Sequence, residues 1–311
     1  MSRSSERERL ALLRALFGAA EAPSLGVGDD AAVLVDPRPL VATVDAAVEG
    51  VHFRRDLLTL EDASARACEA AMSDIAAMGA SLDGPGCGLL LSWTLPPALS
   101  DEDFLLLARG ALRAARRVGT RVVGGNLSAG VELSLSTTVL GRAAHAPLLR
   151  GGARAGDRVA ISGPVGAAAL GLRALLRGDP DPRWREAVDR WRHPLARVDL
   201  SAVLSGRATA CIDVSDGLAL DAARLAEASG ARVVFDRDAL RLHPYATADE
   251  ALDATLHGGE DYELLATGPA SAFDARWTLV GEVLEGAGVY LRDASRLTEV
   301  SPQGWDHFSA T

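Results

Sequence analysis

The sequence of 311 residues contains no lysine, so all 32 positions counted as lysine or arginine are arginines. This absence excludes a phosphate-binding loop of the GxxxxGK[ST] type, in which a lysine contacts the β- and γ-phosphates. If the protein handles phosphate groups, arginine side chains and metal ions must therefore balance their negative charge.

Cysteine and long apolar runs are also scarce. The three cysteines, Cys68, Cys87 and Cys211, form neither a CxxC pair nor a zinc-ligand spacing. No apolar run approaches the roughly 20 residues of a membrane-spanning helix. The first residues are too rich in charge for the apolar segment of a secretory signal. We therefore expect a soluble, cytoplasmic protein with no membrane partner.

Positive charge is in deficit, since the formal net charge is −10. A nucleic-acid partner would favour a basic surface, so we expect none. An acidic surface fits a protein that binds divalent cations, and it fits ordinary solubility equally well. The length, with 48% hydrophobic and 24% charged residues, is sufficient for two folded domains with substantial cores.

Hydrophobic periodicity predicts strands that alternate with helices along the whole chain. The first element is an amphipathic helix with Leu10, Leu13 and Phe17 on one face. A second helix begins after Ser100, a favourable N-cap, with Asp103 at the third helical position. The other elements expected in the first half are strands at 32–35, 40–48, 87–95, 121–130 and 131–143 and a helix at 60–80.

The composition changes near residue 147, where the sequence APLLRGGARAGDRVAISGP begins. The same alternation then resumes, with a helix expected at 195–204. The sequence therefore predicts an α/β (α+β) protein with an N-terminal domain at 1–146 and a C-terminal domain at 147–311.

Aspartates recur where a strand is expected to give way to a glycine or to a helix. Carboxylates at such positions can meet at the edge of a sheet, and Mg²⁺ prefers oxygen ligands. Asp74 is the hardest to explain structurally, because it lies in a helix of small apolar residues. The others could be turn or capping residues. The candidate metal ligands are Asp29, Asp30, Asp45, Asp74, Asp213 and Asp216.

Three glycine pairs lie in expected turns, where backbone can approach a phosphate closely. They are Gly26 with Gly28, Gly124–Gly125 and Gly151–Gly152. Arg150 precedes the last pair and is a candidate phosphate clamp.

Seven segments, in order, resemble the thiamine-monophosphate kinase family of the aminoimidazole-ribonucleotide-synthetase-like ATP-binding superfamily. They are GVGDDAAVL, VEGVHF, SDIAAMGA, RGGARAGDRVAISGPVG, IDVSDGL, GGEDYELL and the terminal GWDHF. The resemblance covers nearly the whole chain. It implies a two-lobed fold of this superfamily: an N-terminal sheet lobe that forms a homodimer, and a C-terminal α/β lobe that closes the active-site cleft.

The resemblance also implies an activity, the transfer of the γ-phosphoryl group of ATP to thiamine monophosphate with Mg²⁺. It implies that Asp30, Asp45, Asp74, Asp213 and Asp216 hold magnesium, and that Gly125, Asn126, Arg150 and Ser215 contact ATP. It further implies that His52, Glu260 and Trp305 bind thiamine monophosphate. Because a phosphate oxygen of the acceptor is itself a nucleophile, transfer is direct, with Asp216-bound magnesium and Arg150 neutralising charge.

The chain departs from the family pattern at Asn126, Val44, Ala46 and Met72, and the first two bear on metal binding. Asn126 stands where the family has an aspartate, so it would be a weaker metal ligand. Val44 replaces a threonine and has no ligating side chain. Two alternatives follow: a superfamily enzyme with another acceptor, or a nucleotide-binding homologue without turnover. The absence of a cysteine before Cys68 and at the C-terminus favours the kinase over two superfamily relatives.

Overall fold

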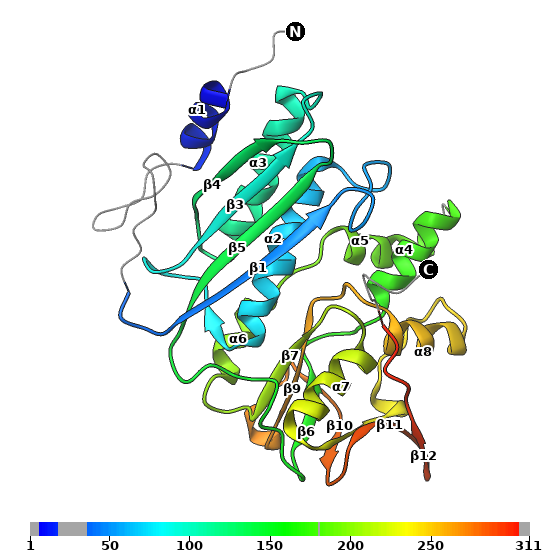
Figure 1. The fold of residues 1–311 in the computed structure, drawn as a ribbon. Helices are drawn as coiled ribbons and strands as arrows, with labels where there is room; N and C mark the ends of the chain where they lie inside the picture. Colours follow the sequence, from blue (N-terminus) through cyan, green and yellow to red (C-terminus); the bar gives the residue numbers. More distant parts are fainter. Residues whose placement is uncertain (1–5, 18–35, 180, 305–311) are drawn as a thin grey trace. The chain divides into compact units, whose positions relative to one another are not determined.

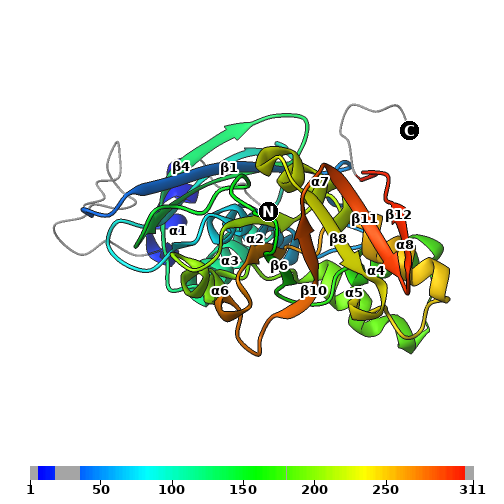
Figure 2. The same ribbon diagram turned by 90° about the horizontal axis from the view of Figure 1, so that it is seen from below.

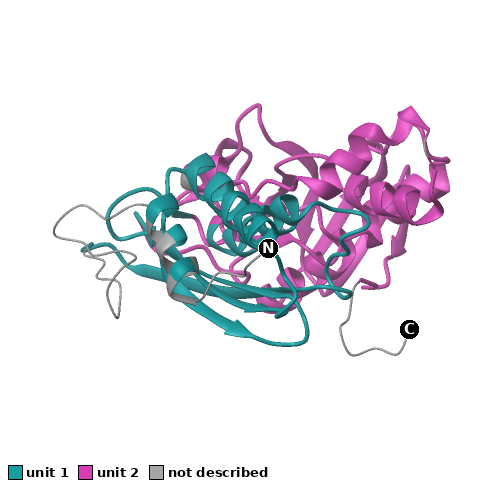
Figure 3. Ribbon diagram, turned by 90° about the horizontal axis from the view of Figure 1, so that it is seen from above, with its two compact units in different colours: residues 1–75, 80–144 teal, residues 76–79, 145–311 magenta. Residues whose placement is uncertain are grey.

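A computed structural model describes residues 6–17, 36–179 and 181–304 (Figure 1). The chain divides into two compact units, shown in two colours in Figure 3. Unit 1 comprises 1–75 and 80–144, and unit 2 comprises 76–79 and 145–311. The strand expected at 32–35 lies outside the described residues. Within the described residues, no helix is both long enough and apolar enough to cross a membrane.

Unit 1 contains a mixed sheet in the order β1-β5-β3-β4, with β2 paired to β5 (Figure 1). Only β3 and β4 run parallel, and the helix α3 connects them. The strands expected at 40–48 and 87–95 and the helix expected at 60–80 are confirmed. The elements of unit 1 are α1 Glu6–Phe17, β1 Leu40–Val48, α2 Leu60–Ala77, β2 Ala80–Ser81, β3 Gly88–Leu95, α3 Asp101–Arg117, β4 Val122–Ala129 and β5 Ser134–Ala143.

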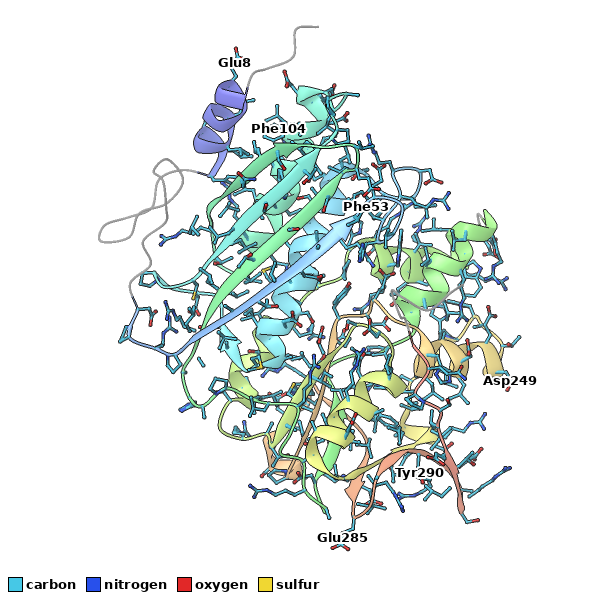
Figure 4. The ribbon with its side chains drawn as sticks, in the orientation of Figure 1. Glu8, Phe53, Phe104, Asp249, Glu285 and Tyr290 are labelled. Carbon is cyan, nitrogen blue, oxygen red and sulfur yellow. The ribbon has the colours of Figure 1, made fainter. Side chains whose placement is uncertain are left out.

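Helix α3 begins as the sequence predicts. The Ser100 hydroxyl accepts the backbone N–H of Asp103 at 3.1 Å, which satisfies one of the free donors at the helix start. Its buried face carries Phe104, labelled in Figure 4, which packs edge-on against Trp93 of β3 with ring centroids 6.3 Å apart. The helix therefore covers one face of the sheet.

The two faces of this sheet differ in burial because side chains alternate along each strand. In β5, Leu135, Thr137 and Val139 are buried, and the residues between them are half-buried. In β1 the alternation places Val41 on the buried face, which we call the helix face. Val44, 67% exposed, lies on the other face, which we call the open face.

Unit 2 contains a seven-stranded sheet in the order β12-β11-β8-β10-β6-β9-β7. Its strands are β6 Arg158–Ile161, β7 Ala210–Val214, β8 Arg232–Asp236, β9 Glu263–Gly268, β10 Thr278–Leu284, β11 Gly288–Asp293 and β12 Arg296–Glu299. Its helices are α4 Ala167–Arg177, α5 Arg185–Arg192, α6 Val198–Leu204, α7 Leu218–Ser229 and α8 Ala248–His257, with short 3₁₀ turns η1 Pro182–Trp184, η2 Arg237–Ala239 and η3 Ala270–Ala272.

Helices cover both faces of the unit 2 sheet, as Figure 2 shows for α7 on one side and α6 on the other. Val159 and Ile161 of β6 pack in the core formed with α7. Ala160, between them, packs in the core formed with α6. Among the described strands of this sheet, β8 and β11 pair in parallel and the other pairs are antiparallel. The mixture of helices and sheets expected from the sequence, α/β (α+β), is therefore confirmed.

Candidate metal and phosphate site

Strand β7 and the loop that joins it to α7 carry three of the candidate residues of unit 2. Asp213 lies in β7 and is 5% exposed. Ser215 and Asp216 follow the end of this strand and precede α7, as the sequence predicts. The Arg224 guanidinium of α7 lies 2.6 Å from the Asp216 carboxylate, which is 27% exposed. One cation of the chain itself therefore contacts the candidate metal ligand.

Asp221, in the first turn of α7, binds the backbone of this loop through hydrogen bonds. Its Oδ2 accepts the backbone N–H groups of Ser215, Asp216 and Gly217 at 3.1, 3.0 and 3.2 Å. Burial raises the pKa of Asp221 to about 6, and the loop N–H groups and Arg224 act in the opposite direction. Asp221 therefore fixes the backbone that presents Asp216. Asp221 was not among the residues predicted from the sequence, although an acid in the first turn after a glycine loop is a recognisable signal.

The turn at 258–262 docks on the same loop. The backbone N–H of Glu260 donates to the carbonyl oxygen of Ser215 at 2.7 Å. The N–H of Tyr262 donates to the carbonyl of Val214 at 2.9 Å. A Cβ on Gly259 would lie only 2.4 Å from the Ser215 carbonyl, so this close approach requires glycine. The structure thus brings Glu260 to Ser215 and Asp216, which precede it by more than 40 residues in sequence.

The backbone of this turn is strained. Glu260 has φ 70° and Tyr262 has φ 53°, a left-handed conformation that is uncommon for side chains of this size. Strain of this kind persists only where surrounding contacts enforce it, and it gathers at functional sites. The structure therefore singles out Glu260 independently of the sequence pattern.

The side chains of the turn are anchored to two helices. The Trp191 indole N–H of α5 donates to Glu260 Oε2 at 2.7 Å. The Asp261 carboxylate accepts the N–H groups of Gly166 and Ala168, at the start of α4, at 2.5 and 3.1 Å. Burial raises the pKa of Asp261 to about 7, although these two donors lower it. Neither Trp191 nor Asp261 was a candidate from the sequence.

The raised pKa of Asp261 predicts a pH-dependent stability. Between its unfolded value near 3.8 and its native value of about 7, the native state binds more protons than the unfolded state. The free energy of unfolding should therefore fall as pH rises through this window and level off above it. Asp261→Asn cannot titrate, so its deficit relative to wild type should be largest near pH 4.5 and shrink towards pH 8. Urea unfolding at several pH values measures this, and parallel curves would contradict it.

In unit 1, Asp45 and Asp74 approach the same side of the sheet. The Thr43 hydroxyl of β1 donates to Asp74 Oδ2 of α2 at 2.6 Å. Asp45 is two residues further along β1 and therefore on the same helix face as Thr43. The expectation that Asp45 lies where a strand ends is wrong, because β1 continues for three residues beyond it, paired with β5. Its exposure arises instead because β1 is an outer strand of the sheet that the described residues form.

Asn126 lies apart from Asp45 within the chain. Ala46 of β1 pairs with Ser136 of β5, which pairs with Ser92 of β3, which pairs with Asn126 of β4. Paired residues lie on the same face of a sheet, so Asn126 lies on the open face with Ala46. Three strand spacings separate β1 from β4, about 14 Å. Within one copy of the sheet, the Asp45 and Asn126 side chains are therefore too far apart to bind the same metal ion.

The prediction that Gly124–Gly125 forms a turn is wrong. Both residues lie inside β4, paired with Leu90 and Leu91 of β3. A Cβ on Gly125 would lie 1.9 Å from the carbonyl oxygen of Leu91. Gly125 therefore allows two parallel backbones to approach closely, a role that composition alone does not distinguish from a turn.

His52 closes the turn after β1. Its Nδ1 accepts the backbone N–H of Val48 at 3.0 Å, which places the proton of the neutral ring on Nε2. Arg150 lies elsewhere in unit 2, where its carbonyl accepts the Ser229 hydroxyl at 3.1 Å at the C-terminal end of α7. Asp216 precedes the other end of this helix, about 18 Å away at 1.5 Å per residue. The backbones of Arg150 and Asp216 are thus well separated.

Three candidate residues, Asp29, Asp30 and Trp305, lie outside the described residues. Within the described ranges, no three His, Cys, Asp or Glu side chains are grouped closely enough to hold a metal ion. The oxygen donors present suit Mg²⁺, which commonly binds one or two carboxylates together with phosphate oxygens and water.

Comparisons with known proteins agree with this fold and these motifs. Residues 28–143 match the family described as AIR synthase related protein, N-terminal domain. The chain is 33% identical to the thiamine-monophosphate kinase of Aquifex aeolicus (strain VF5) over 297 residues, covering 91% of this chain and 92% of the relative. It is 34% identical to that of Mycobacterium tuberculosis (strain ATCC 25618 / H37Rv) over 299 residues, covering 91% and 86%.

A solved structure described as AaThiL complexed with AMPPCP and TMP superposes with a TM-score of 0.80. It is 29% identical in sequence, and the match covers 99% of each chain. Fold and motifs thus define a protein of the AIR synthase related class. Within that class, the chain belongs to the thiamine-monophosphate kinase family.

Proposed function

We propose that this protein transfers the γ-phosphoryl group of ATP to the phosphate of thiamine monophosphate, giving thiamine diphosphate. The observation that carries the proposal is the 2.7 Å hydrogen bond between Glu260 and Ser215. Under the proposal, Ser215 contacts ATP and Glu260 contacts the acceptor, so this bond joins the two substrate subsites. Relatives named for this reaction, and a related structure holding AMPPCP and TMP, support the same substrates.

The proposed mechanism depends on positioning and charge rather than on a covalent intermediate. The acceptor phosphate oxygen is already a nucleophile, and the chain has no lysine to contribute. Magnesium, when bound, supplies positive charge that neutralises the phosphates. Asp213 and Asp216 in unit 2, with Asp45 and Asp74 in unit 1, are the described carboxylates proposed to hold it. Ser215, Gly125 and Arg150 are proposed to bind ATP, with His52 and Glu260 on the acceptor.

Asp29, Asp30 and Trp305 belong to the same proposal through the family resemblance alone. We also propose that residues 1–146 form the ATP- and magnesium-binding and dimerisation domain, and that residues 147–311, which carry Asp213, Ser215 and Asp216, form the α/β domain that closes the active-site cleft. We also propose that the protein is cytoplasmic.

The direct test is thiamine diphosphate formation from ATP, thiamine monophosphate and MgCl₂, followed by chromatography. We expect product with the complete mixture, and none when EDTA exceeds the magnesium. A folded protein that binds ATP but forms no thiamine diphosphate would overturn the proposed reaction. Turnover of another phosphate acceptor under these conditions would instead indicate a different superfamily enzyme.

We further propose that the protein is a homodimer and that Asn126 serves the site of the second copy. Asp45 and Asn126 lie on the two outer strands of the described sheet and on opposite faces. A second copy can bring its Asn126 to Asp45 where a single sheet cannot. The outer strand β1, which carries Asp45, also exposes Leu40 by 53% and Val44 by 67%, apolar surface suited to burial between subunits.

Mixed dimers test this arrangement. Asp45→Ala and Asn126→Ala should each lower activity at least about ten-fold, because each removes an oxygen ligand. Mixing and reassociating the two proteins should then restore about a quarter of wild-type activity, since half of the dimers are mixed and half of their sites are intact. If each site is built from one chain, mixing restores nothing.

A further inference from the structure

We infer that Trp191 is a positioning residue that sets the Glu260 carboxylate for the acceptor substrate. This inference rests on the proposed function, in which Glu260 contacts thiamine monophosphate. Trp191 itself is 2% exposed and lies in α5, about 70 residues before Glu260 in sequence. It acts through the hydrogen bond from its indole Nε1 to Glu260 Oε2, 2.7 Å long.

The backbone of Glu260 is held independently of this bond. Its N–H donates to the Ser215 carbonyl, and the residue has φ 70°. With the backbone fixed, the remaining freedom of Glu260 is in its side-chain torsions. A flexible glutamate side chain loses conformational entropy when it binds a ligand, and a fixed one has already lost it. The indole N–H thus fixes the orientation of the Glu260 carboxylate before the substrate binds.

The position of Trp191 is itself fixed relative to the turn. Asp261, next to Glu260, accepts two N–H groups at the start of α4. Helices α4 and α5 pack so closely that a Cβ on Gly171 would lie 2.1 Å from the Ala187 carbonyl oxygen. The turn, α4, α5 and the Trp191 indole therefore form a closed ring of contacts that returns to Glu260. These contacts together restrict the position of the Glu260 carboxylate.

The bond also matches a donor to an acceptor. An indole N–H can only donate, and a carboxylate oxygen accepts it. The Glu260 carboxylate can attract a cation, and the thiazolium ring of thiamine monophosphate carries a positive charge. ATP carries no such group, so Trp191 should affect the acceptor and leave ATP binding unaltered.

Trp191→Phe tests the inference, because it removes the N–H and keeps an aromatic ring. We expect the KM for thiamine monophosphate to rise about ten-fold, as for loss of a hydrogen bond to a charged group. The KM for ATP and kcat should stay within about two-fold of wild type. Trp184→Phe is the matched control, since Trp184 is equally buried and its Nε1 donates at 2.9 Å to Asp179 rather than to Glu260.

A double variant separates positioning from general packing. Glu260→Gln alone should raise the same KM, and adding Trp191→Phe to it should cause little further change, because Trp191 acts through the Glu260 carboxylate. Additive effects, an equal effect of Trp184→Phe, or a Trp191→Phe protein with wild-type KM would each overturn the inference. If wild type forms no thiamine diphosphate, the proposed function fails and the inference fails with it.

Discussion

Replacing Asp216 by asparagine is expected to lower kcat for thiamine diphosphate formation by about three orders of magnitude, the scale of losing a major electrostatic contact in the transition state. Asparagine keeps the size of the side chain and removes its charge. The proposed magnesium would lose a carboxylate ligand, and Arg224, now 2.6 Å from Asp216, would lose a partner. Steady-state kinetics across a range of MgCl₂ concentrations measures the loss.

The control for this change is Asp253→Asn in the same unit. Asp253 forms an exposed ion pair with Arg173 at 2.8 Å, and pairs of this kind contribute little to stability. This variant should keep wild-type kinetics. An Asp216→Asn protein that is folded, by circular dichroism and thermal melting, and retains more than a tenth of wild-type kcat would remove Asp216 from the proposed metal site.

The second large effect concerns stability rather than catalysis. Gly110→Ala should destabilise unit 1 by about 3 kcal/mol, the upper end of the roughly 1–3 kcal/mol that overpacking of a tight interface usually costs. A Cβ on Gly110 of α3 would lie 2.0 Å from the carbonyl oxygen of Glu61 in α2, and backbone cannot rotate away as a side chain can. Alanine gains about 1 kcal/mol of helix propensity over glycine, which is too little to offset the overlap.

Gly119→Ala provides the comparison, just after the end of the same helix. Gly119 has φ 72°, and an added Cβ meets nothing within 4 Å. Its cost should therefore be about 1 kcal/mol, from backbone strain alone. Urea unfolding of the Gly110→Ala and Gly119→Ala proteins compares the free-energy cost of atomic overlap with that of backbone strain. Equal losses would show that α2 and α3 move apart easily, contrary to the expectation.

Several features of the fold could be predicted from local sequence because local physics determines them. Ser100 begins α3 because its hydroxyl accepts an N–H three residues later, an interaction within one turn of chain. The strand at 40–48 was predicted from its hydrophobic pattern, and β1 has the same bounds. Asp216 was placed between a strand and a helix by the same reasoning, and it lies there.

Other expectations failed where neighbours distant in sequence decide the outcome. Gly124 and Gly125 suggested a turn, but the strand continues because β3 offers a partner backbone at close range. Asp45 suggested a strand end, but its exposure comes from the position of β1 at the side of the sheet. A residue's exposure depends on what packs beside it, and composition does not contain that information.

The sequence by itself determined the α/β alternation, the family and the set of acidic candidates, because periodicity and motif order are properties of the chain. The tertiary structure alone decided how these residues are held. It formed the hydrogen bonds from the Glu260 N–H to the Ser215 carbonyl, from the Asp216 N–H to the Asp221 carboxylate, and from the Trp191 indole to the Glu260 carboxylate. Each of these contacts joins elements whose separation is fixed by packing and backbone hydrogen bonding, and a linear pattern of residue types does not specify either.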